Sequence, residues 1–174
     1  MNTSHDLVST TDDYAHALTA GDYAHATTAG DRSHAFTAGD FSNAVTAGDY
    51  AHALTAGDDA HATTAGDYAH ATTTGAYAHA ATAGRLTYAT TTGIFAHAAT
   101  TGRLSNASVS GENAIAVAVG YNSSARAADG GFIVLAQYDG DTVVAVKTAQ
   151  VGKDGIKPDT WYKLSPTGEF VEAE

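Results

Sequence analysis

A nine-residue repeat runs through the first two thirds of this chain of 174 residues. The segment AGDYAHATT at positions 20–28 returns letter for letter at positions 65–73. With Gly at position 2, which Asp12 replaces in the first repeat, twelve repeats begin at residues 11, 20, 29, 38, 47, 56, 65, 74, 83, 92, 101 and 110. Position 7 is Ala in all twelve repeats, and position 9 is Thr in the first ten. Such a short fixed period is typical of a solenoid, in which each repeat packs only on its neighbours.

The repeat favours β-strands, because Thr and Gly in every nine residues disfavour a helix. The letters AHATT predict a short strand and the letters AGDY predict a turn. Alternation along a strand places positions 5, 7 and 9 on one face and positions 4, 6 and 8 on the other. The first set consists of Ala, Ser and Thr, which suits a narrow interior between two close sheets. Gly at position 2 is expected at a corner that needs an unusual backbone angle.

Position 8 indicates that one coil contains two repeats. Large apolar residues occupy this position in repeats one, three and five, and smaller residues occupy it in repeats two, four and six: Leu18, Phe36 and Leu54 against Thr27, Val45 and Thr63. We therefore predict an all-β fold, a parallel β-solenoid in the form of a flat β-roll. About six coils would be stacked about 4.8 Å apart. Residues 1–10 would lead into a solenoid over residues 11–120.

Residues 121–174 are predicted to form an antiparallel β cap that also serves as an oligomerisation module. Segment 130–152 contains two apolar strands around an Asp-Gly-Asp turn, which is a hairpin signal. A cap is expected because the open end of a solenoid presents an unpaired strand. The expected core of this module is formed by Phe132, Val134, Val143, Val144, Val146, Trp161 and Phe170.

Composition excludes several classes of function. The chain has 19 acidic and 8 basic residues, so it lacks the basic clusters that direct nucleic-acid binding requires. It contains no Cys, which excludes a disulfide framework and a thiolate zinc site. No signal peptide and no apolar run of about 20 residues is visible, so we expect a cytoplasmic protein that does not interact with membranes. Motifs for a nucleophilic Ser, a phosphate loop or a metalloprotease are absent, and we predict no enzymatic activity and no cofactor.

Stacking turns each repeat position into a row of side chains. Position 3 is Asp in the first seven repeats, and residues 1–84 contain ten acidic residues and one basic residue, Arg32. We predict that these rows, with nearby Tyr residues, bind a partner through Asp13, Asp22, Asp31, Asp40, Asp49, Asp58, Asp59, Asp67, Tyr23, Tyr50 and Tyr68. A structural alternative is that each Asp bonds to the backbone of its own turn. That alternative does not explain why Asp stops after Asp67 while Gly continues.

Position 6 carries eight of the nine His residues, which should point outward with four on each face: His16, His25, His34, His52, His61, His70, His79 and His97. Stacked surface imidazoles are favoured over a metal site, because a metal needs several ligands in a set geometry. An apolar stripe and part of the cap are predicted to form a homo-oligomer interface, with a dimer favoured over a trimer: Leu18, Phe36, Leu54, Phe132, Val134 and Trp161.

Two resemblances extend these expectations. The segment NAIAVAVGYNSSARA at 113–127 is similar to the head repeats of YadA-like trimeric autotransporter adhesins, which are also β-rolls. This resemblance implies a structural or adhesive head or fibre module that is exported as a trimer. The repeats together with IKPDTWYKLSPTGEFVEAE at 156–174 resemble a group of uncharacterised phage and gut-bacterial proteins. That resemblance implies a phage setting and no known activity.

The acidic rows lead to the functional hypothesis. Two parallel rows of negative charge on a rod are similar to a nucleic-acid backbone, the principle that pentapeptide-repeat DNA mimics use. We predict a phage-type inhibitor that blocks the basic cleft of a host nucleic-acid-handling (defence) protein. A calcium-ordered β-roll is an alternative, although this repeat lacks the second Gly of the motif GGxGxDxUx, and we predict no bound metal. Ice binding is disfavoured, because the regular Thr at position 9 points inward.

Overall fold

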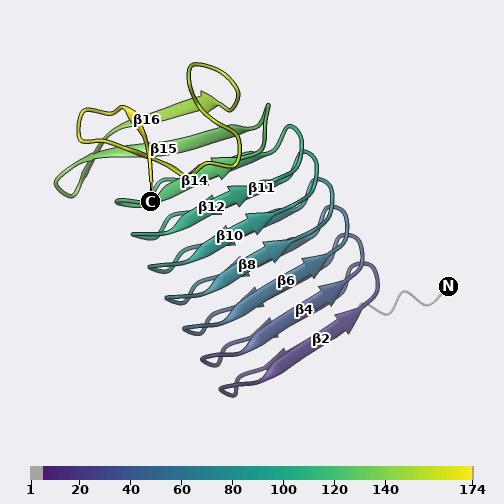
Figure 1. Cartoon of the computed structure of the whole chain (residues 1–174). Helices are drawn as coiled ribbons and strands as arrows, with labels where there is room; N and C mark the ends of the chain where they lie inside the picture. Colours follow the sequence, from purple (N-terminus) through teal and green to yellow (C-terminus); the bar gives the residue numbers. More distant parts are fainter. Residues whose placement is uncertain (1–5, 174) are drawn as a thin grey trace.

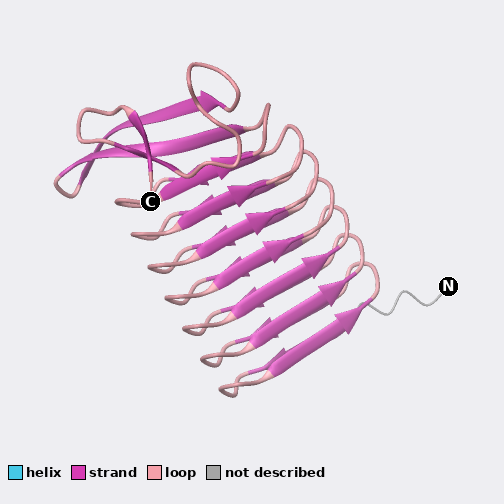
Figure 2. Ribbon diagram, viewed as in Figure 1, coloured by secondary structure: helices cyan, strands magenta, loops and turns pink. Residues whose placement is uncertain are grey.

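The computed structural model describes residues 6–173, which contain strands and turns but no helix, and hence no helix able to cross a membrane. The strands form a parallel β-solenoid of about seven coils that ends in antiparallel strands (Figure 1, Figure 2). The predicted fold class is therefore confirmed, and the expected number of about six coils is too low. The coils stack in one column, with the antiparallel strands at the end opposite the N-terminus (Figure 1).

Each coil contributes one strand to each of two sheets. Sheet 1 contains, in spatial order, β1 (Leu7–Thr10), β3 (His25–Thr28), β5 (Asn43–Thr46), β7 (His61–Thr64), β9 (His79–Thr82), β11 (His97–Thr100), β13 (Ile115–Ala118), β15 (Phe132–Asp139) and β16 (Thr142–Gln150). Sheet 2 contains β2 (His16–Ala20), β4 (His34–Ala38), β6 (His52–Ala56), β8 (His70–Thr73), β10 (Tyr88–Thr91), β12 (Asn106–Val109), β14 (Ser124–Ala127), β17 (Tyr162–Leu164) and β18 (Phe170–Glu172).

The register confirms that a coil contains two repeats. Within sheet 2, His16 pairs with His34 and His34 pairs with His52, so each residue lies beside the one eighteen positions away. The parallel stack extends beyond residues 11–120 at both ends, because β1 pairs with β3 and β14 pairs with β12. Segment 119–127 keeps Gly at position 2 and Ala at position 7, which is why it continues the solenoid after the remaining letters have changed.

Small side chains fill the space between the two sheets. Ala at position 7 is completely or almost completely inaccessible to solvent along the stack, as at Ala17, Ala53 and Ala71. Thr at position 9 is also buried, as at Thr55 and Thr73. The predicted inward set of positions 5, 7 and 9 is therefore confirmed. Because Ala and Thr are short, the two sheets can approach closely and exclude water without large aliphatic residues.

The repeated Gly is required by the contact between coils. A Cβ atom added to Gly66 would overlap the carbonyl oxygen of Gly48, one coil earlier. The expected unusual backbone angle is wrong for most of these glycines, since among them only Gly21 and Gly39 have a positive φ, at 131° and 153°. The left-handed conformation instead occurs at position 4, two residues later in each repeat, where φ is 52–61° in every repeat from the first onward.

The C-terminal segment closes both sheets, and its hairpin is confirmed. Strand β15 pairs in parallel with β13 and antiparallel with β16, while β17 and β18 add to sheet 2. The buried side chains of this segment are Ile133, Leu135, Val151, Ile156 and Tyr162.

The predicted core of the cap is largely wrong. Phe132, Val143, Val144 and Val146 are 39–57% exposed, and Val134 and Trp161 are half-buried. Only Phe170 of the expected set packs on the buried core. The reason is the register of β15, which continues sheet 1 with Phe132 beside the outward Ile115 and therefore turns Ile133 inward.

Core threonines give a test of this interior. Thr55 Oγ1 is buried and has no hydrogen-bond partner among the described residues, whereas Thr37 Oγ1 lies 2.9 Å from Ser42 Oγ. We expect Thr55→Val to raise the free energy of unfolding by about 1 kcal/mol, because it removes an unsatisfied buried hydroxyl at nearly constant volume. The chain itself has the buried Val109 at this repeat position.

The matched control is Thr37→Val, which leaves the Ser42 hydroxyl without its partner and should lower the free energy of unfolding. Urea denaturation followed by circular dichroism measures both. Equal effects of the two substitutions would contradict this account of the core.

Candidate binding surface

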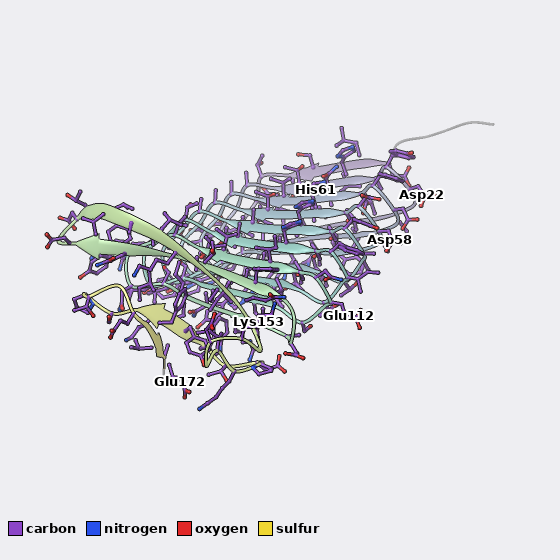
Figure 3. The ribbon with its side chains drawn as sticks, turned by 90° about the horizontal axis from the view of Figure 1, so that it is seen from above. Asp22, Asp58, His61, Glu112, Lys153 and Glu172 are labelled. Atoms are coloured by element: carbon purple, nitrogen blue, oxygen red, sulfur yellow. The ribbon has the colours of Figure 1, made fainter. Side chains whose placement is uncertain are left out.

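The turns place the aspartates along the two edges of the flattened roll. Asp13, Asp31, Asp49 and Asp67 share one edge, which we call edge 1, and Asp22, Asp40 and Asp58 share the other, edge 2. In Figure 3, Asp22, Asp58 and Glu112 follow one another along edge 2, outside the stacked strands. The coils are also bonded at the edges, since Tyr14 N–H donates to Asp31 O and Tyr23 N–H donates to Asp40 O, both at 2.9 Å.

Each of these carboxylates has a structural role between coils. Asp13 Oδ1 accepts the backbone N–H of Asp31 at 2.9 Å, and Asp49 Oδ1 accepts that of Asp67 at 2.8 Å. The same bond repeats along edge 2 and ends with Asp58 Oδ1, which accepts the N–H of Ala76 at 2.8 Å. The side chain therefore bonds to the next coil, and the expected bond within its own turn does not explain the row.

The hydrogen bond needs an oxygen acceptor but no charge, because the side-chain carbonyl of Asn has the same geometry. The negative charge is costly instead, since two carboxylates one coil apart repel each other by about 1 kcal/mol in water. The excess of negative charge is also concentrated in one half of the chain: residues 1–84 have ten acidic residues and one basic residue, and residues 85–174 have nine and seven. At position 3 the later residues on edge 1 are Arg85 and Arg103.

Aromatic side chains form a second exposed row beside the carboxylates. The rings of Tyr50 and Tyr68 stack at 4.8 Å on edge 1, and those of Tyr23 and Phe41 stack at 5.1 Å on edge 2. The structure thus brings the eleven predicted partner-binding residues to two edges, with Tyr50 and Tyr68 on edge 1 and Tyr23 and Asp59 on edge 2. All of them are exposed except Asp59 and Asp67, which are half-buried.

Arg32 also lies on edge 1. It is the one basic residue among residues 1–84, and the sequence predicted no role for it. Its guanidinium carbon lies 5.5 Å from the Tyr14 ring centroid and 5.4 Å from that of Tyr50, and its Nη1 donates to Tyr14 Oη at 2.7 Å. The signal was present in the sequence, because Tyr stands eighteen residues before and after it. The contact holds the one cation of the acidic half against aromatic rings.

The histidines form one outward column on each sheet, as predicted. His16, His34, His52 and His70 stand on strands β2, β4, β6 and β8, and their rings stack at 4.8–4.9 Å. The second column consists of His25, His61, His79 and His97 on sheet 1. Within residues 6–173, no group of three His, Cys, Asp or Glu side chains is arranged to hold a metal ion.

The first column favours the uncharged imidazole. Burial lowers the pKa of His34, His52 and His70, and the neighbouring imidazoles lower the pKa of His34 and His52 further. On sheet 1, burial and its two His neighbours lower the pKa of His79, while Asp59 opposes that shift. These shifts favour the uncharged form of His34, His52, His70 and His79.

A groove lies on the outer face of sheet 2 in the same coils as the acidic rows. The apolar stripe Leu18, Phe36 and Leu54 runs beside the histidine column, and together they line a shallow groove of about 360 Å³. We call this feature the axial groove, since it runs along the stack across strands β2, β4, β6 and β8. Leu18 is 62% exposed and is the most open of its apolar residues.

The predicted oligomer-interface residues do not form one surface. Phe132 and Val134 lie on sheet 1, on the opposite side of the roll from the axial groove. Trp161 lies in the cap, directly before β17, with the guanidinium carbon of Arg126 4.7 Å from its ring centroid. Arg126 occupies the same column as Leu54, four coils further along sheet 2. The homo-oligomer stays a prediction with two separate candidate surfaces.

Comparison with protein-family models, curated proteins and solved structures finds no match to this chain.

Acidification should destabilise the fold through His34, His52, His70 and His79, the pKa of each being lowered in the folded chain. A His with a lowered folded-state pKa binds a proton more readily after unfolding, so the free energy of unfolding falls as pH drops below about 6.5. We expect stability to be constant from pH 8 to pH 7 and to decline from pH 6.5 to pH 5. Urea denaturation at each pH measures this slope.

The control is His52→Asn with His70→Asn, which places in this column a residue that the chain already has at Asn43 and Asn106. The slope between pH 6.5 and pH 5 should become smaller in this variant. An unchanged slope would show that other groups cause the pH dependence.

The hydrogen bond that Asp49 accepts from the next coil predicts different effects on stability for two substitutions of this residue. Asp49→Asn should keep the bond to the Asp67 N–H and remove one repulsive charge, so the melting temperature at low salt should stay the same or rise. Asp49→Ala removes the acceptor and should cost about 0.5–1 kcal/mol. Thermal melts at low and high salt test this, and a destabilisation of similar size in both variants would contradict it.

Proposed function

We propose that this protein is a non-enzymatic acidic binding protein, a phage-type inhibitor that mimics nucleic-acid charge. Its acidic edges would block the basic cleft of a host nucleic-acid-handling protein that acts in defence. The observation that supports this proposal most is the excess of charge in the first four coils. Seven positions of the two edges are Asp, although the hydrogen bonds between coils require only an acceptor oxygen.

The density of charge is close to that of a duplex. Two carboxylates per coil correspond to about one charge per 2.4 Å of rod, against about 1.7 Å for double-stranded DNA. A basic cleft that has evolved to neutralise phosphates would therefore meet a similar field along the first four coils.

The carboxylates are also held in place. Each of them accepts a backbone N–H of the following coil, so the rows are fixed relative to the rigid sheet stack. A flexible acidic tail would lose conformational entropy on binding, whereas these edges lose little. The exposed Tyr50 and Tyr68 beside them add apolar contact area of the kind that protein interfaces favour.

The test is a pull-down from bacterial lysate with the quadruple variant Asp31→Asn, Asp40→Asn, Asp49→Asn and Asp58→Asn. Asn keeps each acceptor oxygen, so the fold should survive, which circular dichroism checks. We expect the native chain to retain a nucleic-acid-binding protein at low salt, to release it at high salt and to inhibit its DNA binding. The quadruple variant should retain none of it.

The matched control removes four negative charges from the cap, with Asp139→Asn, Asp141→Asn, Asp154→Asn and Asp159→Asn. All four side chains are exposed and lie away from the acidic edges. This control should bind as the native chain does. Equal retention by the native chain and the edge variant would refute the proposal.

A structural or fibre module is the second candidate, and one observation favours it. Strands β1 and β2 stand at the N-terminal ends of their sheets and have no neighbour on one side among the described residues. Unpaired parallel edges favour end-to-end association of copies. This function predicts trimers or longer assemblies that do not dissociate in salt, which light scattering after gel filtration measures. A salt-independent assembly without a retained partner would replace the inhibitor with this module.

A further inference from the structure

The axial groove is bordered on both sides by acidic rows. Strands of sheet 2 begin after the turns of edge 1 and end before the turns of edge 2, so edge 1 borders the histidine column and edge 2 borders the apolar stripe. Across one strand the order is therefore carboxylate, imidazole, apolar side chain and carboxylate, as in Asp31, His34, Phe36 and Asp40. This order is repeated in neighbouring coils at the spacing of the sheet.

The two faces of the roll differ in the size of the side chains in this outward column. The corresponding column of sheet 1 in the same coils contains Thr27, Val45 and Thr63, which are smaller than Leu18, Phe36 and Leu54. Both columns project outward from strands with the same register, and both are bordered by the same acidic edges. The large apolar residues of sheet 2 are thus not required by the solenoid, because the column continues with Thr72 and Thr90 in the later coils.

The size of the groove suits a single segment of chain. It extends over four coils, or about 14 Å along the stack, and over about 17 Å of strand length. The resulting area of about 240 Å² is well below the roughly 800 Å² per partner of a standard protein interface. A second copy of this chain would therefore gain too little from this surface alone, whereas one helix or strand could cover it.

An α-helix matches the spacing of the coils. One helical turn rises about 5.4 Å, and strands in a sheet are about 4.8 Å apart, so the two repeats drift by less than 2 Å over three coils. Apolar side chains at every third or fourth helical position would then meet Leu18, Phe36 and Leu54 in succession. A helix of about ten residues is long enough to span the groove.

The acidic edges indicate which charge the flanks of such a helix should have. Cationic side chains on the flanks of such a helix would reach toward the carboxylates of the two edges. Burial lowers the pKa of His34, His52 and His70, which disfavours a positive charge on these side chains beside the flank of such a helix. An acidic or uncharged segment would gain the apolar contact but not the electrostatic one.

We propose that the axial groove binds a cationic amphipathic helix of the partner protein, with its apolar face on Leu18, Phe36 and Leu54 and its basic flanks toward the two acidic edges. This inference rests on the proposed function for the role of the edges and adds the class of partner element that they recognise. The apolar stripe is the observation that charge mimicry alone does not use.

The experiment uses the purified full chain at pH 7.5 and two synthetic fluorescent peptides of about fifteen residues. One peptide has Leu and Phe on one helical face and Lys and Arg on the flanks, and the other has the same composition in an order without an apolar face. Fluorescence anisotropy gives the dissociation constants. The variants are Phe36→Thr with Leu54→Thr, the edge variant with four Asn, and Val45→Thr on the opposite face as the matched control. Circular dichroism confirms that each variant is folded.

We expect the amphipathic peptide to bind the native chain at least about tenfold more tightly than the permuted peptide, because two or more large side chains lose their water contact. Phe36→Thr with Leu54→Thr should weaken binding by about the same factor, and Val45→Thr should leave it unchanged. The edge variant should weaken binding and reduce its salt dependence.

Three outcomes would overturn the inference. Equal binding of both peptides, lost only in the edge variant, would leave the acidic edges as the binding surface and exclude the groove, so the proposed function would stand. Binding that is insensitive to the edge variant would remove the role of charge and would count against the proposed function as well. A native dimer that Phe36→Thr with Leu54→Thr dissociates would assign the groove to a second copy of the chain.

Discussion

The parallel hydrogen bonds between successive coils are the constraint on which the rest of this structure depends. His34 N–H donates to Ala15 O at 2.8 Å and His52 N–H donates to Ser33 O at 3.0 Å, and the same bond recurs along both sheets. Because each coil repeats the path of the one before it, side chains that lie between coils or between sheets must be small. The recurring Gly of the turn and the Ala and Thr of the interior are consequences of this stacking.

Stacking places chemically identical groups next to each other, which is favourable for some residues and costly for others. Imidazoles and phenol rings stack at ring separations near 5 Å, which is a favourable contact between neighbouring strands. Carboxylates in the same arrangement repel one another, and the hydrogen bond that each makes to the next coil offsets part of this cost. A row of Asp that continues over four coils is therefore informative, since Asn would provide the bond without the repulsion.

The two halves of the rod differ in charge and in their outward side chains. The first four coils combine the acidic edges with the stripe of large apolar side chains formed by Leu18, Phe36 and Leu54. The later coils have Arg85 and Arg103 on edge 1 and lead into the cap, where Ile133, Leu135 and Tyr162 are buried. The proposed binding surface and the cap are thus separated along the axis, and variants in one half should leave the other half intact.

The solenoid, its inward and outward positions and its two repeats per coil could all be predicted from the sequence. These properties are periodic, and a strand's alternation together with the pattern at Leu18, Phe36 and Leu54 is sufficient to read them. The residues of the acidic edges and of the histidine columns could be predicted from the same nine-residue spacing. The extension of the stack to β1 and β14 did not, because those segments keep the spacing but few of the letters.

The contacts that explain the repeated residues could be identified only in the folded chain. The role of Gly as a contact between coils and the bond from each Asp to the next coil join residues eighteen positions apart, and local turn rules do not include such partners. The cap was the least predictable part, because it is not periodic. Ile115 pairs with Phe132, so the turn before β15 is one residue shorter than the repeat would give, and Ile133 faces the interior in place of Phe132. That register depends on packing against β13 and β16.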